Sequence, residues 1–94
     1  MENIEAKTVV LRCKSSTDAS KLASSIYSLY QGDNNVVIFL NVIGAGALNQ
    51  AIKAAIISNK FFSKKGLVVA LQPSFQEAIE NITAIGLKVL FQKI

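Results

Sequence analysis

The chain has 94 residues, of which 51% are hydrophobic and 17% are charged, and its formal net charge is +4. This hydrophobic fraction excludes an intrinsically disordered chain, and the length predicts a single domain over residues 1–94. No run reaches the ~18 consecutive apolar residues of a membrane-spanning helix, and the acidic start, Met1–Glu5, does not resemble a basic signal-peptide start. The single cysteine, Cys13, excludes an internal disulfide. We therefore expect a soluble, cytoplasmic protein.

The positive charge is unevenly distributed along the chain. Up to Ala47, four basic residues balance four acidic ones, whereas after it six lysines face only Glu77 and Glu80. This modest basic bias is compatible with a polyanionic partner without requiring one.

The first elements in chain order are a strand and a helix. Apolar residues alternate over residues 8–13, as in a strand with one buried face. In the loop that follows, Ser16 or Thr17 is expected to cap the next helix, and Asp18 is expected to complement the helix dipole. That helix is expected to run to about Gln31, with small and large apolar residues along one stripe.

Apolar patterning predicts four further elements: a central buried strand over 36–42, a helix to about Lys60, a strand over 67–72, and a strand from Ile82 or Ala84 to Gln92. Pro73 is expected to stop the third strand, because proline donates no ladder hydrogen bond. Residues 73–81 would then form a loop, with room for a short helical turn over 75–79.

This βαβαββ order predicts an α/β protein, more specifically an α+β two-layer sandwich. Two strands joined through a helix imply a parallel pair with a right-handed crossover. The last two strands are close enough in sequence to form an antiparallel pair. The expected architecture is a four-stranded mixed sheet with both helices on one face.

Gly44 and Gly46 lie at the second strand-to-helix junction. The backbone N–H groups from Gly44 to Leu48 could bind a phosphate or a carboxylate, because the first N–H groups of a helix lack helical partners. Alternatively, the glycines merely permit a tight turn and close packing. A dinucleotide fingerprint is not indicated, because Asn49 replaces its third glycine, and no Gly-Lys-Ser/Thr follows to make a P-loop.

The loop after the first strand carries basic and hydroxyl residues. Since parallel neighbouring strands end at the same edge of a sheet, this loop and the glycine turn are expected to converge there. The alternative is a capped helix start with a solvated lysine. The candidate nucleic-acid-binding residues are Arg12, Lys14, Ser15, Ser16, Gly44, Gly46, Asn49 and Lys53.

The second helix has two predicted arcs, at about 100° per residue. The core side is expected to hold Leu48, Ala51, Ile52, Ala55 and Asn59. A different, outer arc carries Asn49, Lys53, Ile57 and Lys60. A large apolar residue on an outer arc indicates a partner surface, although one exposed isoleucine is also ordinary. The candidate oligomer interface is Ile57 with Phe61 and Phe62.

Catalytic and metal-binding patterns are missing from the sequence. The chain has no histidine, and its six carboxylates are scattered without metal-ligand spacing. Cys13 has no neighbouring base and points inward in the predicted strand, as a small hydrophobic residue would. We expect a protein that is not an enzyme and that needs no cofactor or metal.

The segment IGAGALNQAIKA, residues 43–54, resembles the central motif of the stage V sporulation protein S family, and Cys13–Ser16 resembles its KSS segment. The resemblance runs from about Val10 to the C-terminus. It implies an Alba-like fold with sheet order 1-2-4-3, and dimerisation through the second helix and the last hairpin. Lysines in the equivalent loop of Alba proteins contact nucleic acid, which points to Lys14.

The last hairpin departs from the Alba pattern. In Alba proteins it is long and basic, whereas residues 72–86 contain no lysine or arginine and carry Glu77 and Glu80, which repel phosphate. This segment is a candidate for protein contact, with Phe75 and Ile79 as anchors, unless both pack on the domain's own sheet.

The sequence thus predicts a small, non-enzymatic, homo-oligomeric regulator of the stage V sporulation protein S type that binds the backbone of DNA or RNA. One alternative is an oligomeric protein–protein interaction module without nucleic-acid binding. Another is a sensor for a small anion at the glycine turn.

Overall fold

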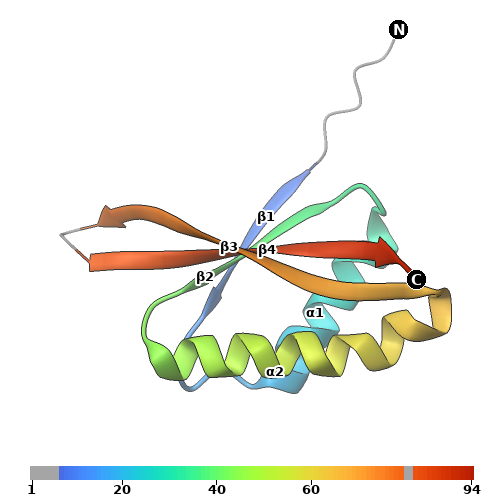
Figure 1. Ribbon diagram of the computed structural model, residues 1–94, viewed down its shortest axis with the longest axis horizontal. Helices are drawn as coiled ribbons and strands as arrows, with labels where there is room; N and C mark the ends of the chain where they lie inside the picture. The colour runs from blue at the N-terminus through green and yellow to red at the C-terminus, as the bar shows by residue number, and fades with distance from the viewer. Residues whose placement is uncertain (1–6, 80–81) are drawn as a thin grey trace, which may run out of the picture.

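The computed structural model describes residues 7–79 and 82–94, and it describes side chains for residues 7–76 and 84–94. Its elements, in chain order (Figure 1), are β1 (Thr8–Cys13), α1 (Ala19–Gly32), β2 (Val37–Val42), α2 (Ala45–Phe62), the 3₁₀ turn η1 (Ser63–Lys65), β3 (Leu67–Ile79) and β4 (Ile82–Lys93).

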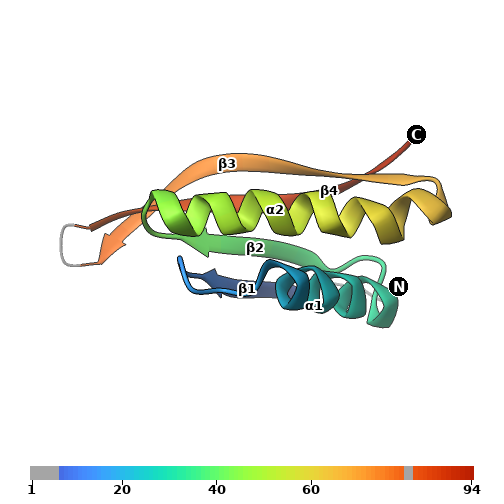
Figure 2. The ribbon, with the colours of Figure 1, turned by 90° about the horizontal axis from the view of Figure 1, so that it is seen from below.

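The strands form one mixed sheet in the order β1-β2-β4-β3. β1 runs parallel to β2, with Thr8 opposite Val37 and Cys13 opposite Val42, while β4 is antiparallel to both of its neighbours. Both helices lie on the same face of the sheet (Figures 1 and 2). The predicted two-layer βαβαββ architecture and its sheet order are confirmed.

The third strand is longer than predicted. It passes through Pro73 and continues to Ile79, so the predictions of a stop at Pro73 and of a helical turn over 75–79 are wrong. The proline is tolerated because β3 lies at the edge of the sheet, where a residue has no strand on its outer side to receive an N–H. The rest of the predicted loop, residues 80–81, lies outside the described residues.

The core lies between the sheet and the two helices. On β2 the inward side chains of Ile38, Leu40 and Val42 are at most 1% exposed, whereas the alternating outward residues are half-buried. The predicted strand over 36–42 is therefore buried on one face only, because helices cover one face of the sheet. On α1 the predicted apolar stripe faces the core, with Leu22, Ala23, Ile26 and Ala19 buried.

The second helix is rotated relative to the prediction. Its buried residues are Ala47, Ala51, Ala54, Ala55, Ser58 and Phe62. Ile52, expected on the core side, is 45% exposed, and Ile56 is 60% exposed. Ile57, expected on the outer arc, is half-buried against the core. The rotation follows from the small alanines, which let the helix axis approach the sheet more closely than isoleucine would.

Phe62 is the centre of an aromatic cluster at the C-terminal end of α2. Its ring centroid lies 5.3 Å from Tyr27, 5.2 Å from Tyr30 and 5.0 Å from Phe91, and the side chain is 0% exposed. The prediction that Phe62 lies on an exposed interface is therefore wrong. The sequence alone does not show which of the two neighbouring phenylalanines is buried, and Phe61 is 37% exposed.

The Phe62→Ala variant should lose about 3–5 kcal/mol of unfolding free energy, because it leaves a cavity among three aromatic rings. Phe61→Ala is the matched control, and its loss should be clearly smaller because Phe61 already contacts water. Urea denaturation followed by circular dichroism measures both, and equal losses would contradict the described core.

Candidate nucleic-acid interface

The loop between β1 and α1 and the glycine turn between β2 and α2 lie at the same edge of the sheet. This follows from the parallel register, in which Cys13 and Val42 end their strands side by side. Both helices therefore begin at this edge. The predicted convergence of the two connections is confirmed by the contacts between them.

Three contacts hold the two connections together. A Cβ added to Gly46 would lie 2.9 Å from the Cβ of Ser15, so only glycine permits this approach. The side-chain amide of Gln50 donates to the carbonyl of Thr17 at 2.7 Å, and the thiol of Cys13 donates to the carbonyl of Ala47 at 3.2 Å. The first turns of α2 are thus fixed at Gly46, Ala47 and Gln50 against the loop and the end of β1.

The loop also has its own hydrogen bonds. The Lys14 N–H donates to the Thr17 hydroxyl at 2.8 Å, and the Thr17 N–H donates back to the Lys14 carbonyl at 3.0 Å. Asp18 caps α1 by accepting from the N–H groups of Ser20 and Lys21. The prediction of Ser16 or Thr17 as the cap is wrong, because Asp18 lies one residue before the helix and Thr17 is engaged by Lys14.

The N-terminus of α2 has no side-chain cap. Gly44 occupies the cap position with φ of 94°, which glycine adopts without strain. The first helical bond runs from the Leu48 N–H to the Gly44 carbonyl, so the N–H groups of residues 45–47 have no acceptor within the helix. No acidic residue lies in this first turn. No side chain in the first turn of α2 therefore neutralises the partial positive charge at the N-terminus of this helix.

The predicted residues are exposed, but only some of them lie together. Ser15 contacts Gly46, and the Lys14 backbone is fixed in the same loop. Lys53 follows Gly46 by seven residues, about 20° short of two full turns, so it lies on the same side of α2 as Gly46. Arg12 alternates with the inward Cys13 and so faces the other side of the sheet. Arg12 therefore does not join the cluster around Lys14.

Cys13 is buried, with 3% of its surface exposed. Burial raises the pKa of the Cys13 thiol, and a hydrogen bond with Thr17 opposes part of that rise. The thiol therefore stays protonated at neutral pH, which fits the predicted role of a small hydrophobic residue. Within the described residues, no group of three or more histidine, cysteine, aspartate or glutamate side chains is placed to hold a metal ion.

Gln50 is a site residue that the sequence did not single out. Its hydrogen bond to Thr17 joins residues 33 positions apart, so no local pattern reveals it. The one available signal is spacing, because Gln50 follows Gly46 by four residues and must share its side of the helix.

Two further surfaces were predicted, the oligomer interface on α2 and the protein contact on the last hairpin. On α2, Phe61 is partly exposed and packs at a tilt against Tyr27 with ring centroids 5.4 Å apart, whereas Ile57 and Phe62 face inward. In the hairpin, Phe75 is 84% exposed, so it does not pack on the domain's own sheet. The side chain of Ile79 lies outside the described residues.

This fold and this edge define a small two-layer protein of Alba-like architecture, with an open helix N-terminus beside the loop that bears Lys14. Residues 9–92 match the family model for stage V sporulation protein S, so the chain belongs to that family. It is accordingly a small sporulation-related protein. No curated protein matches the chain. In the part of the chain that the structure describes, no helix is both long and apolar enough to span a membrane.

Gly46→Ala should destabilise the protein by about 1–2 kcal/mol, because the added methyl group would overlap Ser15. This reverses the usual helix preference, in which alanine is favoured over glycine by about 1 kcal/mol. Gly32→Ala is the control, since a Cβ there would meet no atom within 4 Å. Thermal unfolding of both variants tests the close contact between Gly46 and Ser15. A Gly46→Ala protein as stable as Gly32→Ala would contradict that contact.

Proposed function

We propose that the protein is a non-enzymatic cytoplasmic regulator that binds the phosphate backbone of nucleic acid at the edge formed by the β1–α1 loop and the α2 N-terminus. The observation that carries this proposal is the uncapped α2 N-terminus, held rigidly against the loop that bears Lys14. Free N–H groups and a lysine at one place suit a phosphate group.

The proposed contacts extend along α2. Ser15 and Ser16 are exposed and neither caps α1, so both hydroxyls are available to phosphate oxygens. Asn49 and Lys53 continue the surface, with Lys53 about 10 Å beyond Gly46 along the helix axis. Asp18 is the acidic residue of this loop, and its carboxylate is engaged by two N–H groups of α1.

Binding of this kind carries little sequence information. Contacts to phosphates and sugars fix position, whereas base edges specify sequence. The uncharged and acidic composition of residues 72–86 gives no basic arm that could enter a groove. We therefore propose that the protein binds DNA or RNA with little sequence preference and without a cofactor or a metal ion.

Fluorescence anisotropy with labelled duplex DNA, single-stranded DNA and RNA tests this function. The wild-type protein should bind with micromolar affinity that falls steeply with salt, and Lys14→Glu/Lys53→Glu should bind at least about tenfold more weakly. Lys7→Glu/Lys64→Glu changes the net charge equally, at exposed positions outside this surface, and should retain most of the affinity.

Two results would overturn the proposal. One is no binding to any of the three nucleic acids at low salt. The other is an equal loss of affinity in the control variant, which would reduce the effect to net charge.

A protein–protein interface is the second candidate function, favoured by exposed apolar side chains. Ile52 and Ile56 lie one turn apart on α2 and are 45% and 60% exposed, and Phe75 on the hairpin is 84% exposed. Isolated apolar residues are common on surfaces, but two large ones a turn apart on one face of α2 favour contact with a partner. We propose that this surface forms a homo-oligomer, in place of the predicted surface around Ile57. Lys53 lies three residues before Ile56 and about 60° from it around the helix, so an interface at Ile52 and Ile56 would border Lys53 and compete with the nucleic-acid contact proposed there.

Ile52→Asp/Ile56→Asp should convert the oligomer to a monomer without unfolding it, because both side chains already contact water. Multi-angle light scattering at high micromolar concentration measures the mass, and circular dichroism controls for folding. A wild-type protein that is already monomeric at this concentration would contradict the oligomer.

A further inference from the structure

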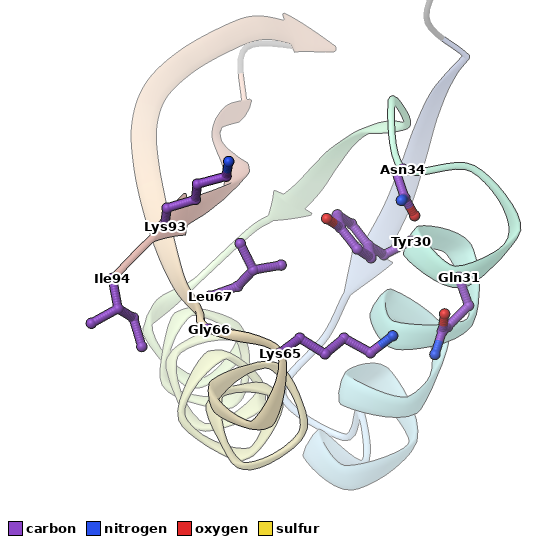
Figure 3. A pocket seen from close by; sticks show the side chains of 8 residues that line it. All are labelled: Tyr30, Gln31, Asn34, Lys65, Gly66, Leu67, Lys93 and Ile94. Atoms are coloured by element: carbon purple, nitrogen blue, oxygen red, sulfur yellow. The ribbon is translucent and has the colours of Figure 1, made fainter.

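A second polar site lies at the opposite end of the molecule from the candidate interface. It is a bowl of about 400 Å³ between the C-terminal end of α1, the η1–β3 turn and the end of β4 (Figure 3). The 18 residues of α2 separate it from the glycine turn, a distance of about 27 Å along the helix. The polar residues that line it are Tyr30, Gln31, Asn34, Lys65 and Lys93.

Every polar side chain that lines the bowl can donate a hydrogen bond. Lys65 and Lys93 supply two ammonium groups from different elements, and Tyr30 and Asn34 supply a hydroxyl and an amide. None of the described lining residues is acidic. The C-terminal end of α1 contributes a partial negative charge of about half a unit, which the two lysines exceed. The bowl therefore favours an anion.

One wall of the bowl, the Tyr30 ring, is fixed before any ligand arrives. The Tyr30 ring is held by Phe62 at 5.2 Å and by Phe91 at 4.5 Å, which sets the position of its hydroxyl. The Lys65 ammonium lies 5.4 Å from the centre of the Tyr27 ring, a cation–π distance. Figure 3 shows Lys65 reaching across the bowl toward Gln31. Tyr30 would lose little side-chain freedom on binding, whereas Lys65 and Lys93, whose ammonium groups lie on different sides of Tyr30 in Figure 3, would have to turn toward the same phosphate.

The turn that carries Lys65 is equally constrained. Gly66 adopts φ of 75°, a left-handed conformation suited to glycine, and its N–H donates to the Ser63 carbonyl. The N–H of Ile94 donates to the Gly66 carbonyl at 3.0 Å, and Leu67 pairs with Lys93. These bonds hold Lys65 and Lys93 on adjoining walls, although they are 28 residues apart in sequence.

We propose that this bowl binds a phosphate group through Lys65, Lys93 and the Tyr30 hydroxyl. Two ammonium groups match the charge of a phosphomonoester, and the volume admits the phosphate with an attached sugar. The phosphate comes either from a free small molecule such as a mononucleotide or from a nucleic-acid backbone. The site does not depend on the glycine-turn interface.

Nuclear magnetic resonance titration of the labelled full chain tests the proposal with three probes: inorganic phosphate, adenosine monophosphate and a short duplex DNA without terminal phosphates. Saturable shifts are expected at the amides of residues 30–34, 65–67 and 93–94. Saturation by the first two probes identifies a small-molecule site, and saturation by the duplex alone identifies a backbone contact.

Lys65→Gln/Lys93→Gln should weaken this binding at least tenfold. Lys60→Gln/Lys64→Gln removes the same charge from neighbouring positions that do not line the bowl, and should weaken it less than twofold. Tyr30→Phe keeps the ring and removes the hydroxyl, so it should weaken binding several-fold with the fold intact.

These experiments distinguish a bowl that does not bind phosphate from a glycine-turn interface that does not bind nucleic acid. No saturable shift at the bowl with any probe, or equal losses in the two lysine double variants, overturns the phosphate site. Loss of duplex binding in Lys14→Glu/Lys53→Glu would still support the glycine-turn interface.

Discussion

The close approach of Gly46 to Ser15 is the contact on which the candidate interface depends. It is possible because β1 and β2 are parallel and end together, and because Gly46 has no side chain. The hydrogen bonds from Gln50 to Thr17 and from Cys13 to Ala47 strengthen the same junction. These contacts fix the β1–α1 loop beside the free N–H groups of α2. Preorganised donors bind an anion without a further entropic cost for ordering them.

The other end of α2 is organised by a different interaction, the packing of aromatic rings around Phe62. This cluster closes the space between α1, α2 and the ends of β3 and β4, where the helices lie over the sheet. It also places the Tyr30 hydroxyl and Lys65 at the rim of the polar bowl. One helix thus joins two polar sites, with a core of alanines between them that keeps it close to the sheet.

Much of the architecture follows from local sequence patterns. The alternation in β1, the stripe on α1, the glycines at the β2–α2 junction and the apolar runs of the last two strands together predict the element order, and the resemblance adds the sheet order. The course of β3 through Pro73 was not predictable locally, because edge position depends on the whole sheet. The rotation of α2 was also missed, because hydrophobicity alone ranks Ile52 above Ala54, whereas close packing against the sheet favours the smaller residue. At the site, the convergence of Lys14 with Gly46 was predictable from strand parallelism. The Gln50–Thr17 bond required the structure, whereas the separation of Arg12 already follows from the alternation along β1.

The central claim is that nucleic acid contacts the edge where the β1–α1 loop meets the α2 N-terminus. Amide hydrogen exchange of the full chain, measured with and without a saturating duplex DNA, tests it most directly. Amide exchange at residues 14–17 and 45–47 should slow on binding. Protection confined to the β3–β4 hairpin or to the outer surface of α2, with no change at these amides, would contradict it.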